Sequence, residues 1–385
     1  MSDVGQLAAK ARALLSRGGG TESSGGTGPI DNRALCDAVA HTLRRIVAPK
    51  GAEVTDGLPE AVRLAAAAAV WRARSALDRT ESSAPFDAED RSALELIVRT
   101  IGRPALRYRG GEVEMPPNTL GDNSRWQIVV ATARATINAL SSRVGRIARD
   151  SALDPVLGTG WRVGPDLLVT NRHVARELVV DRERPPSEWR LGANHDIFVD
   201  FAYSDCTQGP ARYALDGLVY CAEDRWVDLA VFRVKPGNAP LPPPLPIDWD
   251  VDLLGRQFSE GGAPQFRGGE VYTVGHPYRI DATEHTRGVF GDADGRKRFS
   301  PGLVTAIRDD KPIFLHDCST LGGNSGSCVI SLETATHAVV GLHFGGREET
   351  ETEDTGLGVA NFAVAFGRIK AQKHQAAEIM ESGKA

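Results

Sequence analysis

A serine set among glycines is the clearest chemical signal in this chain. It lies in LGGNSGS, residues 321–327. A serine hydroxyl is a weak nucleophile unless a base takes its proton and hydrogen-bond donors hold the oxyanion that forms on the attacked carbonyl. Glycines let the backbone turn its N–H groups toward one point, so the amides of Gly323 and Ser325 could be those donors. A Gly/Ser-rich hairpin turn explains this segment, taken alone, equally well.

Two further segments could supply a base and a carboxylate. In LLVTNRHVA, residues 167–175, a β-branched strand runs into His173. The end of a strand is a good position for a base, although a single histidine is more often structural or exposed. In WVDLAVFRV, residues 226–234, Asp228 begins an apolar strand that would bury its carboxylate. A buried carboxylate needs a partner, which could be a cation such as Arg233 or an imidazole N–H.

Taken together, the three residues occur in the order His, Asp, Ser, which is the chymotrypsin-type order. The segments TNRHV, DLAV and GGNSGS resemble the motifs of the bacterial trypsin-like serine peptidases. The resemblance covers roughly residues 144 to 370. It implies His173 as general base and acid, Asp228 as the carboxylate that orients it, Ser325 as nucleophile, and Gly323 with Ser325 as oxyanion hole. The implied activity is a serine endopeptidase that works through an acyl-enzyme.

Other classes need residues that this chain does not have in the right place. An α/β-hydrolase requires G-x-S-x-G with its histidine last, but Ser327 occupies the final glycine position and His173 comes first. A Ser/Lys peptidase requires a nearby lysine, and Lys311 is the closest one before Ser325. A scaffold that keeps the peptidase fold only for binding has no use for all three catalytic residues.

The sequence gives little indication of a metal site or of disulfide bonds. The DADG segment at 292–295 resembles the start of a calcium loop, but no glutamate closes it, so a glycine hairpin is favoured. The odd number of cysteines and the lack of a CxxC pair argue against a disulfide framework and a structural zinc site. We therefore expect no metal, no cofactor and a reducing cytoplasm. The five cysteines are Cys36, Cys206, Cys221, Cys318 and Cys328.

The motifs differ from those of secreted trypsins at telling positions. Neither Gly158 nor Val174 is a cysteine, so the disulfide that holds the catalytic histidine loop in those enzymes is absent. Asn324 replaces the aspartate that pairs with a newly cut amino terminus in their zymogens. Because asparagine carries no charge, we do not expect activation by that kind of cleavage.

The specificity pocket resembles that of the glutamyl endopeptidases. The segments STLGGNSGS (319–327) and GLHFGG (341–346) carry this resemblance. It implies that Thr320 and His343 contact an acidic substrate side chain. The acidic run REETETED at 347–354 would repel such a substrate unless it lies away from the pocket. His343 could equally be a hydrogen-bonded core histidine. The predicted substrate-binding residues are Thr320, His343, Phe344 and Gly345.

The elements that must position these residues are short strands. From about Val144 the chain consists of β-branched runs separated by Gly, Pro and Asp, a pattern typical of sandwiches and barrels. With the resemblance, this predicts two six-stranded antiparallel barrels preceded by a small all-α domain. The expected strands are 167–170, 229–234, 271–275, 303–307, 313–316, 338–344 and 359–365.

The first hundred residues have the patterns of a flexible tether and of helices rather than of strands. GGGTESSGGTGPI at 18–30 has the composition of a flexible tether. Helical spacing follows behind Asp31, after Pro59 and from about Asp87, and again from Trp126 to Leu140. The expected divisions are an N-terminal segment (1–30), a helical domain (31–104), a connecting region (105–143), the peptidase domain (144–372) and a tail (373–385).

Composition limits the partners. The 385 residues carry a formal charge of -5, so no sequence-wide basic surface for nucleic acid is expected. Neither a membrane-spanning helix nor a secretory signal is expected. The helical module resembles the effector-associated or adaptor helices that accompany such peptidases in bacterial defence and signalling systems. This implies a helical adaptor partner besides the peptide substrate, although a stabilising extension would explain the helices as well.

Overall fold

A computed structural model describes most of the chain, and the chain separates into two compact units. One unit comprises Met1–Pro104, Met115–Thr132 and Asp281–Ala293, and the other comprises Ala105–Glu114, Ala133–Ile280 and Asp294–Ala385. The domain divisions expected from the sequence stay predictions. The described residues are 32–47, 59–79, 103–116, 122–150, 156–192, 197–204, 211–224, 226–237, 240–260, 263–278, 293–334, 336–346 and 361–383, with the single positions 11, 12, 15, 89, 90, 93, 289 and 290.

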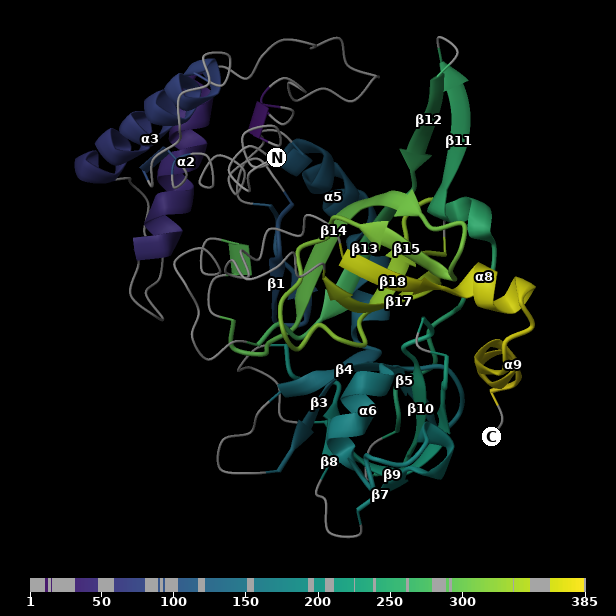
Figure 1. Ribbon diagram of the computed structural model, residues 1–385. Coiled ribbons are helices and arrows are strands. Elements are labelled where there is room, and N and C mark those ends of the chain that lie inside the picture. The colour runs from purple at the N-terminus through teal and green to yellow at the C-terminus, as the bar shows by residue number, and fades with distance from the viewer. Residues whose placement is uncertain are drawn as a thin grey trace. The chain divides into compact units, whose positions relative to one another are not determined.

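The first barrel, teal in Figure 1, is a closed ring of six antiparallel strands. Around the ring the order is β10-β5-β4-β3-β8-β9. Alternate side chains point inward, and Ile147, Val199 and Phe232 are fully buried in its core. The strands are β3 (Val144–Arg149), β4 (Val156–Arg162), β5 (Leu167–Thr170), β8 (Ile197–Asp200), β9 (Arg212–Cys221) and β10 (Ala230–Val234).

The second barrel, green to yellow in Figure 1, is also six-stranded and antiparallel. Its order is β13-β16-β17-β18-β15-β14, and pairing of β13 with β14 closes the ring around buried Val271, Phe314 and Val329. The predicted double-barrel fold is therefore confirmed. The strands are β13 (Glu270–Gly275), β14 (Arg298–Ile307), β15 (Ile313–His316), β16 (Cys328–Ser331), β17 (Val339–Gly346) and β18 (Asn361–Ala365).

Part of the expected connecting region belongs to this second sheet. β1 (Leu106–Arg109) pairs with β14, and β2 (Glu112–Val113) pairs with β1. Within β1, Leu106 and Tyr108 are buried, whereas Arg109 at its end is exposed. The turn-rich composition of this stretch concealed the short alternation that makes it a strand.

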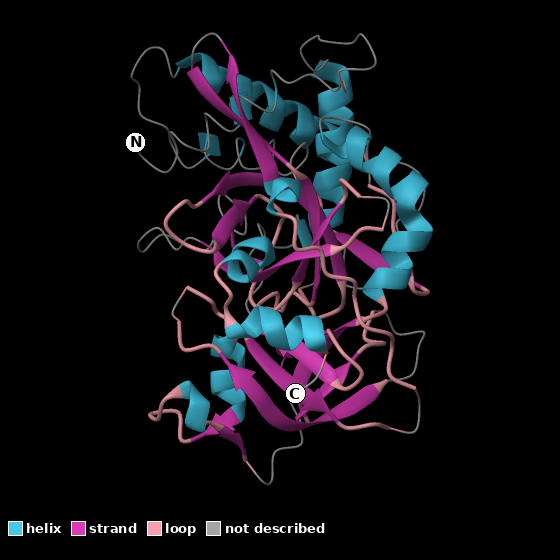
Figure 2. Ribbon diagram, turned by 90° about the vertical axis from the view of Figure 1, so that its right-hand side faces the viewer, coloured by secondary structure: helices cyan, strands magenta, loops and turns pink. Residues whose placement is uncertain are grey.

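Short helices and two small hairpins complete the barrel unit, as Figure 2 shows by secondary structure. α6 begins at Arg172, and Asn171, its N-cap residue, connects it to the end of β5. These elements are α6 (Arg172–Leu178), β6 (Val179–Val180), β7 (Arg190–Leu191), β11 (Gly255–Glu260), β12 (Ala263–Gly268), α8 (Phe366–Ala371), α9 (Gln375–Ser382) and the 3-10 helices at Pro186–Glu188 and Val251–Leu254.

Two long helices near the amino terminus contact each other: α2 (Asn32–Val47) and α3 (Glu60–Arg79). They bury Leu35 and Val39 on one helix and Val70 on the other. The helix predicted near Asp87 is described only at three helical positions. The tether at 18–30, the acidic run at 347–354 and Cys206 lie outside the described residues.

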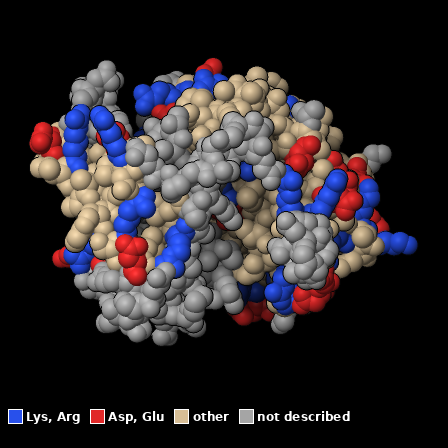
Figure 3. Space-filling model, turned by 90° about the horizontal axis from the view of Figure 1, so that it is seen from above, with Lys and Arg blue, Asp and Glu red and all other residues tan. Residues whose placement is uncertain are grey.

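The predicted helix at 126–140 is present as α5 (Asp122–Ser141), which passes from the first unit into the second. Among the helices that the structure describes, none has the length and apolar character needed to span a bilayer. On the face drawn in Figure 3, basic and acidic side chains are interspersed.

A buried lysine joins the end of α5 to the barrels. The ammonium of Lys297, just before β14, donates to the carbonyls of Ser141 at 2.7 Å and Phe201 at 3.0 Å. Ser141 ends α5 and Phe201 follows β8, so one side chain links its own segment to two others that are distant in the sequence. Burial lowers the pKa of Lys297 to about 7, while the charge of Asp200 acts in the opposite direction.

This burial predicts a pH-dependent stability. Above pH 7 folded Lys297 loses its proton while the unfolded chain keeps it, so the unfolded state binds more protons and stability rises with pH. Between pH 7 and 9 this adds about 2 kcal/mol to the free energy of unfolding. Urea unfolding should therefore show that the free energy of unfolding rises more from pH 7 to pH 9 in the wild type than in Lys297→Met. If the difference in the free energy of unfolding between the two proteins did not change with pH, Lys297 would be shown to keep its proton.

Candidate active site

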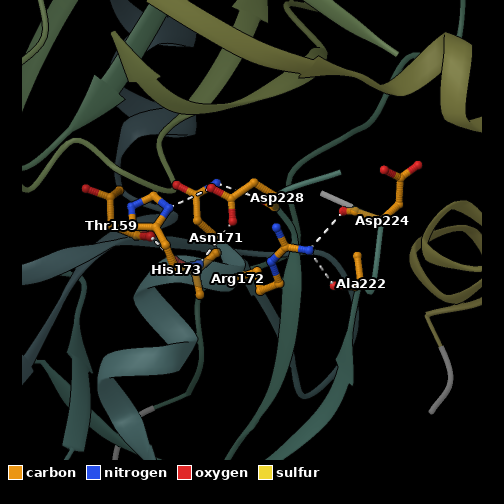
Figure 4. A network of polar contacts seen from close by, with 8 residues as sticks. Thr159, Asn171, Arg172, His173, Ala222, Asp224 and Asp228 are labelled. Carbon is orange, nitrogen blue, oxygen red and sulfur yellow. Dashed lines mark hydrogen bonds and ion pairs between the residues drawn. The ribbon is translucent and has the colours of Figure 1, made fainter. Parts of the chain in front are cut away.

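The pairing of β5 with β10 brings His173 and Asp228 together. Thr170, at the end of β5, is the register partner of Ala230, at the start of β10. His173 lies in the first turn of α6, and Asp228 lies two residues before β10. Their side chains therefore leave the barrel at neighbouring strand ends and face each other in Figure 4.

The carboxylate of Asp228 holds His173 at two points. Its Oδ1 accepts the backbone N–H of His173 at 3.0 Å, and its Oδ2 lies 2.6 Å from the ring Nδ1. Because an ionised carboxylate only accepts hydrogen bonds, the ring proton belongs on Nδ1 and Nε2 keeps a lone pair. Asp228 is buried, whereas the His173 side chain is 47% exposed. The imidazole therefore presents a basic nitrogen at the surface.

The cation considered as a partner of Asp228 forms an ion pair with a different carboxylate. Arg233, the cation considered for Asp228, instead pairs with Asp166, with its Nε 3.2 Å from that carboxylate. The imidazole is thus the partner of the buried aspartate.

Two neighbours of His173 fasten the segment that carries Asp228. Asn171 donates from Nδ2 to the carbonyl of Asp228 at 2.8 Å. Arg172 donates to the carbonyls of Ala222, Glu223 and Asp224, at 3.1, 3.1 and 2.9 Å. Figure 4 shows both side chains reaching toward this segment. The motif TNRHV contains both residues, but its sequence alone does not predict their contacts with the Asp228 segment.

The Ser325 loop connects β15 to β16 and is a series of tight turns. Asn324 N–H donates to Leu321 at 3.0 Å and Ser327 N–H donates to Asn324 at 2.9 Å. Gly323 and Gly326 have φ values of +82° and +89°, in the left-handed region. A Cβ on Gly326 would lie 2.1 Å from the carbonyl oxygen of Thr159, so only glycine fits there.

The loop meets the histidine segment at β4. The N–H of Thr159 donates to the carbonyl of Ser325 at 2.8 Å. A Cβ on neighbouring Gly158 would lie 2.8 Å from the side chain of Val174 and 3.1 Å from the Ser325 carbonyl. Val174 therefore fills the space beside Gly158, at the positions where secreted trypsins have a disulfide. The residue after His173 and the backbone of Ser325 approach the same point.

Ser325 and His173 are not yet hydrogen-bonded to each other. Among the described residues the Ser325 hydroxyl has no hydrogen-bond partner, and His173 contacts only Asp228 through its ring.

Two backbone N–H groups of the loop are available for a ligand. The carbonyl of Gly322 accepts from the N–H of Tyr278 at 2.7 Å. In a planar trans peptide the following N–H, that of Gly323, points the opposite way. Within the described part of the chain, neither Gly323 N–H nor Ser325 N–H has an acceptor.

The predicted pocket residues already have protein partners. Thr320 donates its hydroxyl to Asn361 Oδ1 at 2.8 Å, and Asn361 Nδ2 donates to the carbonyl of Cys318 at 2.7 Å. Phe344 stacks on Phe362 with ring centroids 6.1 Å apart. Space is open where a Cβ of Gly345 would stand.

His343 belongs to a buried pair of histidines. Its Nδ1 lies 3.2 Å from Nε2 of His316, and its backbone bonds to Gly326 and Ser327 place it beside the Ser325 loop. Burial lowers the pKa of His343 well below its ordinary value; His316 and His173 lower it further, and a hydrogen bond with the backbone of Phe362 opposes them. Burial likewise lowers the pKa of His316 to about 3. Both rings are therefore neutral near pH 7.

Nothing in the described ranges resembles a metal centre, and Lys311 is occupied elsewhere. No cluster of three His, Cys, Asp or Glu side chains occurs among the residues described. Asp294, from the calcium-like segment, is bound to Arg296 and Arg298 instead. The ammonium of Lys311 lies 3.5 Å from the ring centroid of Trp226 and 3.6 Å from Asp310.

Comparison with known proteins agrees with this geometry. Residues 158–342 match the trypsin-like peptidase domain. A probable serine protease of Lysobacter enzymogenes is 26% identical over 312 residues, which cover 73% of this chain and 74% of that protein.

Solved structures show weaker likeness. Rv3671c of Mycobacterium tuberculosis is 19% identical with a TM-score of 0.35, over 62% of this chain and 89% of that one. The thermostable serine protease AL20, from an extremophilic microorganism, is 16% identical with a TM-score of 0.40, over 62% and 98%. The domain match, the curated relative and the double barrel support one assignment: this chain carries a trypsin-like peptidase domain and is a hydrolase.

Proposed function

We propose that the protein is an endopeptidase that cleaves peptide bonds through His173, Asp228 and Ser325. The two-point grip of Asp228 on His173 is the observation that carries this proposal, because it leaves Nε2 as a base at the surface. In this proposal the Ser325 loop supplies the nucleophile, and its two N–H groups, which have no acceptor among the described residues, bind the oxyanion.

The reaction follows from these positions. Ser325 Oγ attacks the substrate carbonyl as its proton passes to His173 Nε2, and Asp228 stabilises the imidazolium that forms. Gly323 and Ser325 N–H groups bind the oxyanion. The imidazolium then protonates the leaving amine, which departs and leaves an acyl group on Ser325. Water, deprotonated by the same nitrogen, releases the product acid and restores the serine.

Chemical labelling tests this assignment. A fluorophosphonate probe should modify Ser325 in the folded protein, and Ser325→Ala should abolish labelling. His173→Ala should lower kcat on the order of 10⁴- to 10⁶-fold, and the double variant should lose little more because the two groups act as a unit. Labelling of another serine, or additive losses, would contradict the assignment.

We also propose a modest preference for an acidic substrate side chain. His343 and Thr320 flank the Ser325 loop, which supports the resemblance to glutamyl endopeptidases. Their donor hydrogens are, however, shared with Phe362 and Asn361, so a carboxylate must compete for them. A gain of about 1.4 kcal/mol, near the low end for a hydrogen bond to a charged group, corresponds to a tenfold preference.

Matched substrates test this preference. The ratio of kcat/KM for a Glu substrate to that for its Gln analogue should be about 10 and should fall in His343→Ala. It should stay flat from pH 6 to 8, because burial already keeps His343 neutral there, and any pH dependence that both substrates share cancels in the ratio. A ratio near one, or a ratio indifferent to His343, would show that His343 is a core residue.

The helical unit suggests regulation by a partner, and we propose a role in a bacterial signalling or defence system in the cytoplasm. On α3, Leu64 and Trp71 are 64% and 71% exposed. They are seven residues apart and thus share one helix face that a helical adaptor could cover. α5 connects this unit to the barrels in a single helix. The four described cysteines form no disulfide, which suits a reducing compartment.

A further inference from the structure

The hydroxyl of Thr159 lies at the contact between the first barrel and the Ser325 loop. Thr159 is on β4 and fully buried. Its Oγ1 donates to the carbonyl of Gly323 at 2.8 Å. The same oxygen accepts the backbone N–H of His276, which follows β13, at 3.1 Å.

The donor and acceptor in each of these two hydrogen bonds are fixed. The N–H of His276 can only donate, so Oγ1 must accept there. A hydroxyl has one proton, and that proton therefore goes to Gly323. One side chain thus fastens the loop to β4 and to the end of β13 at the same time.

This anchor acts on a residue that has little stiffness of its own. Gly323 has φ +82° and no Cβ, so its backbone has few steric barriers to rotation. Tyr278 N–H holds the carbonyl before it, and Thr159 holds its own carbonyl. Both peptide planes that flank Gly323 are therefore fixed, and with them the direction of its N–H.

We propose that Thr159 is a positioning residue that keeps the Gly323 N–H aimed for oxyanion binding. The inference rests on the proposed roles of Gly323 and Ser325 and goes beyond them, because Thr159 touches neither substrate nor reacting atoms. The backbone of Thr159 also binds Ser325, but only the hydroxyl contacts Gly323.

Thr159→Val is the direct test, because it keeps the shape of the side chain and removes only the hydroxyl. Removal of one oxyanion donor costs about 10²- to 10³-fold in kcat; loss of its anchor should cost about 10- to 100-fold, with KM changed less than about twofold. Thr159→Ser, which keeps the hydroxyl, should restore kcat to within about threefold of the wild type. Fluorophosphonate titration counts the competent sites in each preparation.

Ser331→Ala is the matched control. Ser331 is fully buried at the end of β16, and its Oγ accepts the N–H of Glu333 at 3.1 Å, away from Gly323. This variant should lower the unfolding midpoint without changing kcat. If Thr159→Val does not fold, Thr159→Cys replaces it, and the weak S–H donor should give a kcat between those of the wild type and Ser325→Ala.

The outcomes separate this proposal from the proposed function. A folded Thr159→Val or Thr159→Cys enzyme with wild-type kcat would overturn the role of Thr159 while labelling of Ser325 still stood. A drop in kcat that Thr159→Ser does not rescue would mean that the site depends on packing rather than on the hydroxyl, and would overturn it as well. Failure of the probe to label Ser325 would instead refute the catalytic assignment.

Discussion

The two hydrogen bonds from His173 to the Asp228 carboxylate are the interaction on which the site depends. The two carboxylate oxygens accept the backbone N–H and the ring Nδ1 of one residue, which sets both the start of α6 and the orientation of the imidazole. A buried carboxylate without such partners would be costly. The pairing of β5 with β10 brings the two residues together, and Asn171 and Arg172 hold the segment in which Asp228 lies. The first barrel thus orients the imidazole that we propose as the base.

The second barrel carries Ser325, the proposed nucleophile, on a loop that has little rigidity of its own. Glycines allow the left-handed turns at Gly323 and Gly326, and the same freedom has to be offset by contacts with other segments. Thr159 from the first barrel and Tyr278 from the second supply these contacts. Assembly of the site therefore depends on the packing of one barrel against the other at β4, and no disulfide among the described cysteines assists it.

The local motifs were enough to predict the double-barrel fold, and they also name His173, Asp228 and Ser325, whose catalytic roles stay predictions. TNRHV, DLAV and GGNSGS each combine a reactive residue with the strand or turn that must present it, so their order in the sequence was informative. β1 was missed because its partner β14 lies almost two hundred residues later, and a strand of four residues has little periodicity to detect.

Interactions between distant residues explain what else was missed. Thr159 is an ordinary strand residue until the loop of Gly323 is folded against it. Thr320 and His343 were identified by type, but their partners Asn361 and His316 come from other strands. Those partners decide whether a pocket side chain can serve a substrate. The expected divisions of the chain into domains, and the role of the helical unit, stay predictions for the same reason.

A crystal structure of the protein with a peptide aldehyde bound is the most direct test of the whole arrangement. We expect a hemiacetal on Ser325 Oγ whose oxygen lies about 3 Å from the N–H groups of both Gly323 and Ser325. His173 should remain bound to Asp228 through Nδ1, with its Nε2 turned to the adduct. An adduct whose oxygen points away from Gly323, or a Gly322 carbonyl that has left Tyr278 and turned into the site, would contradict this account.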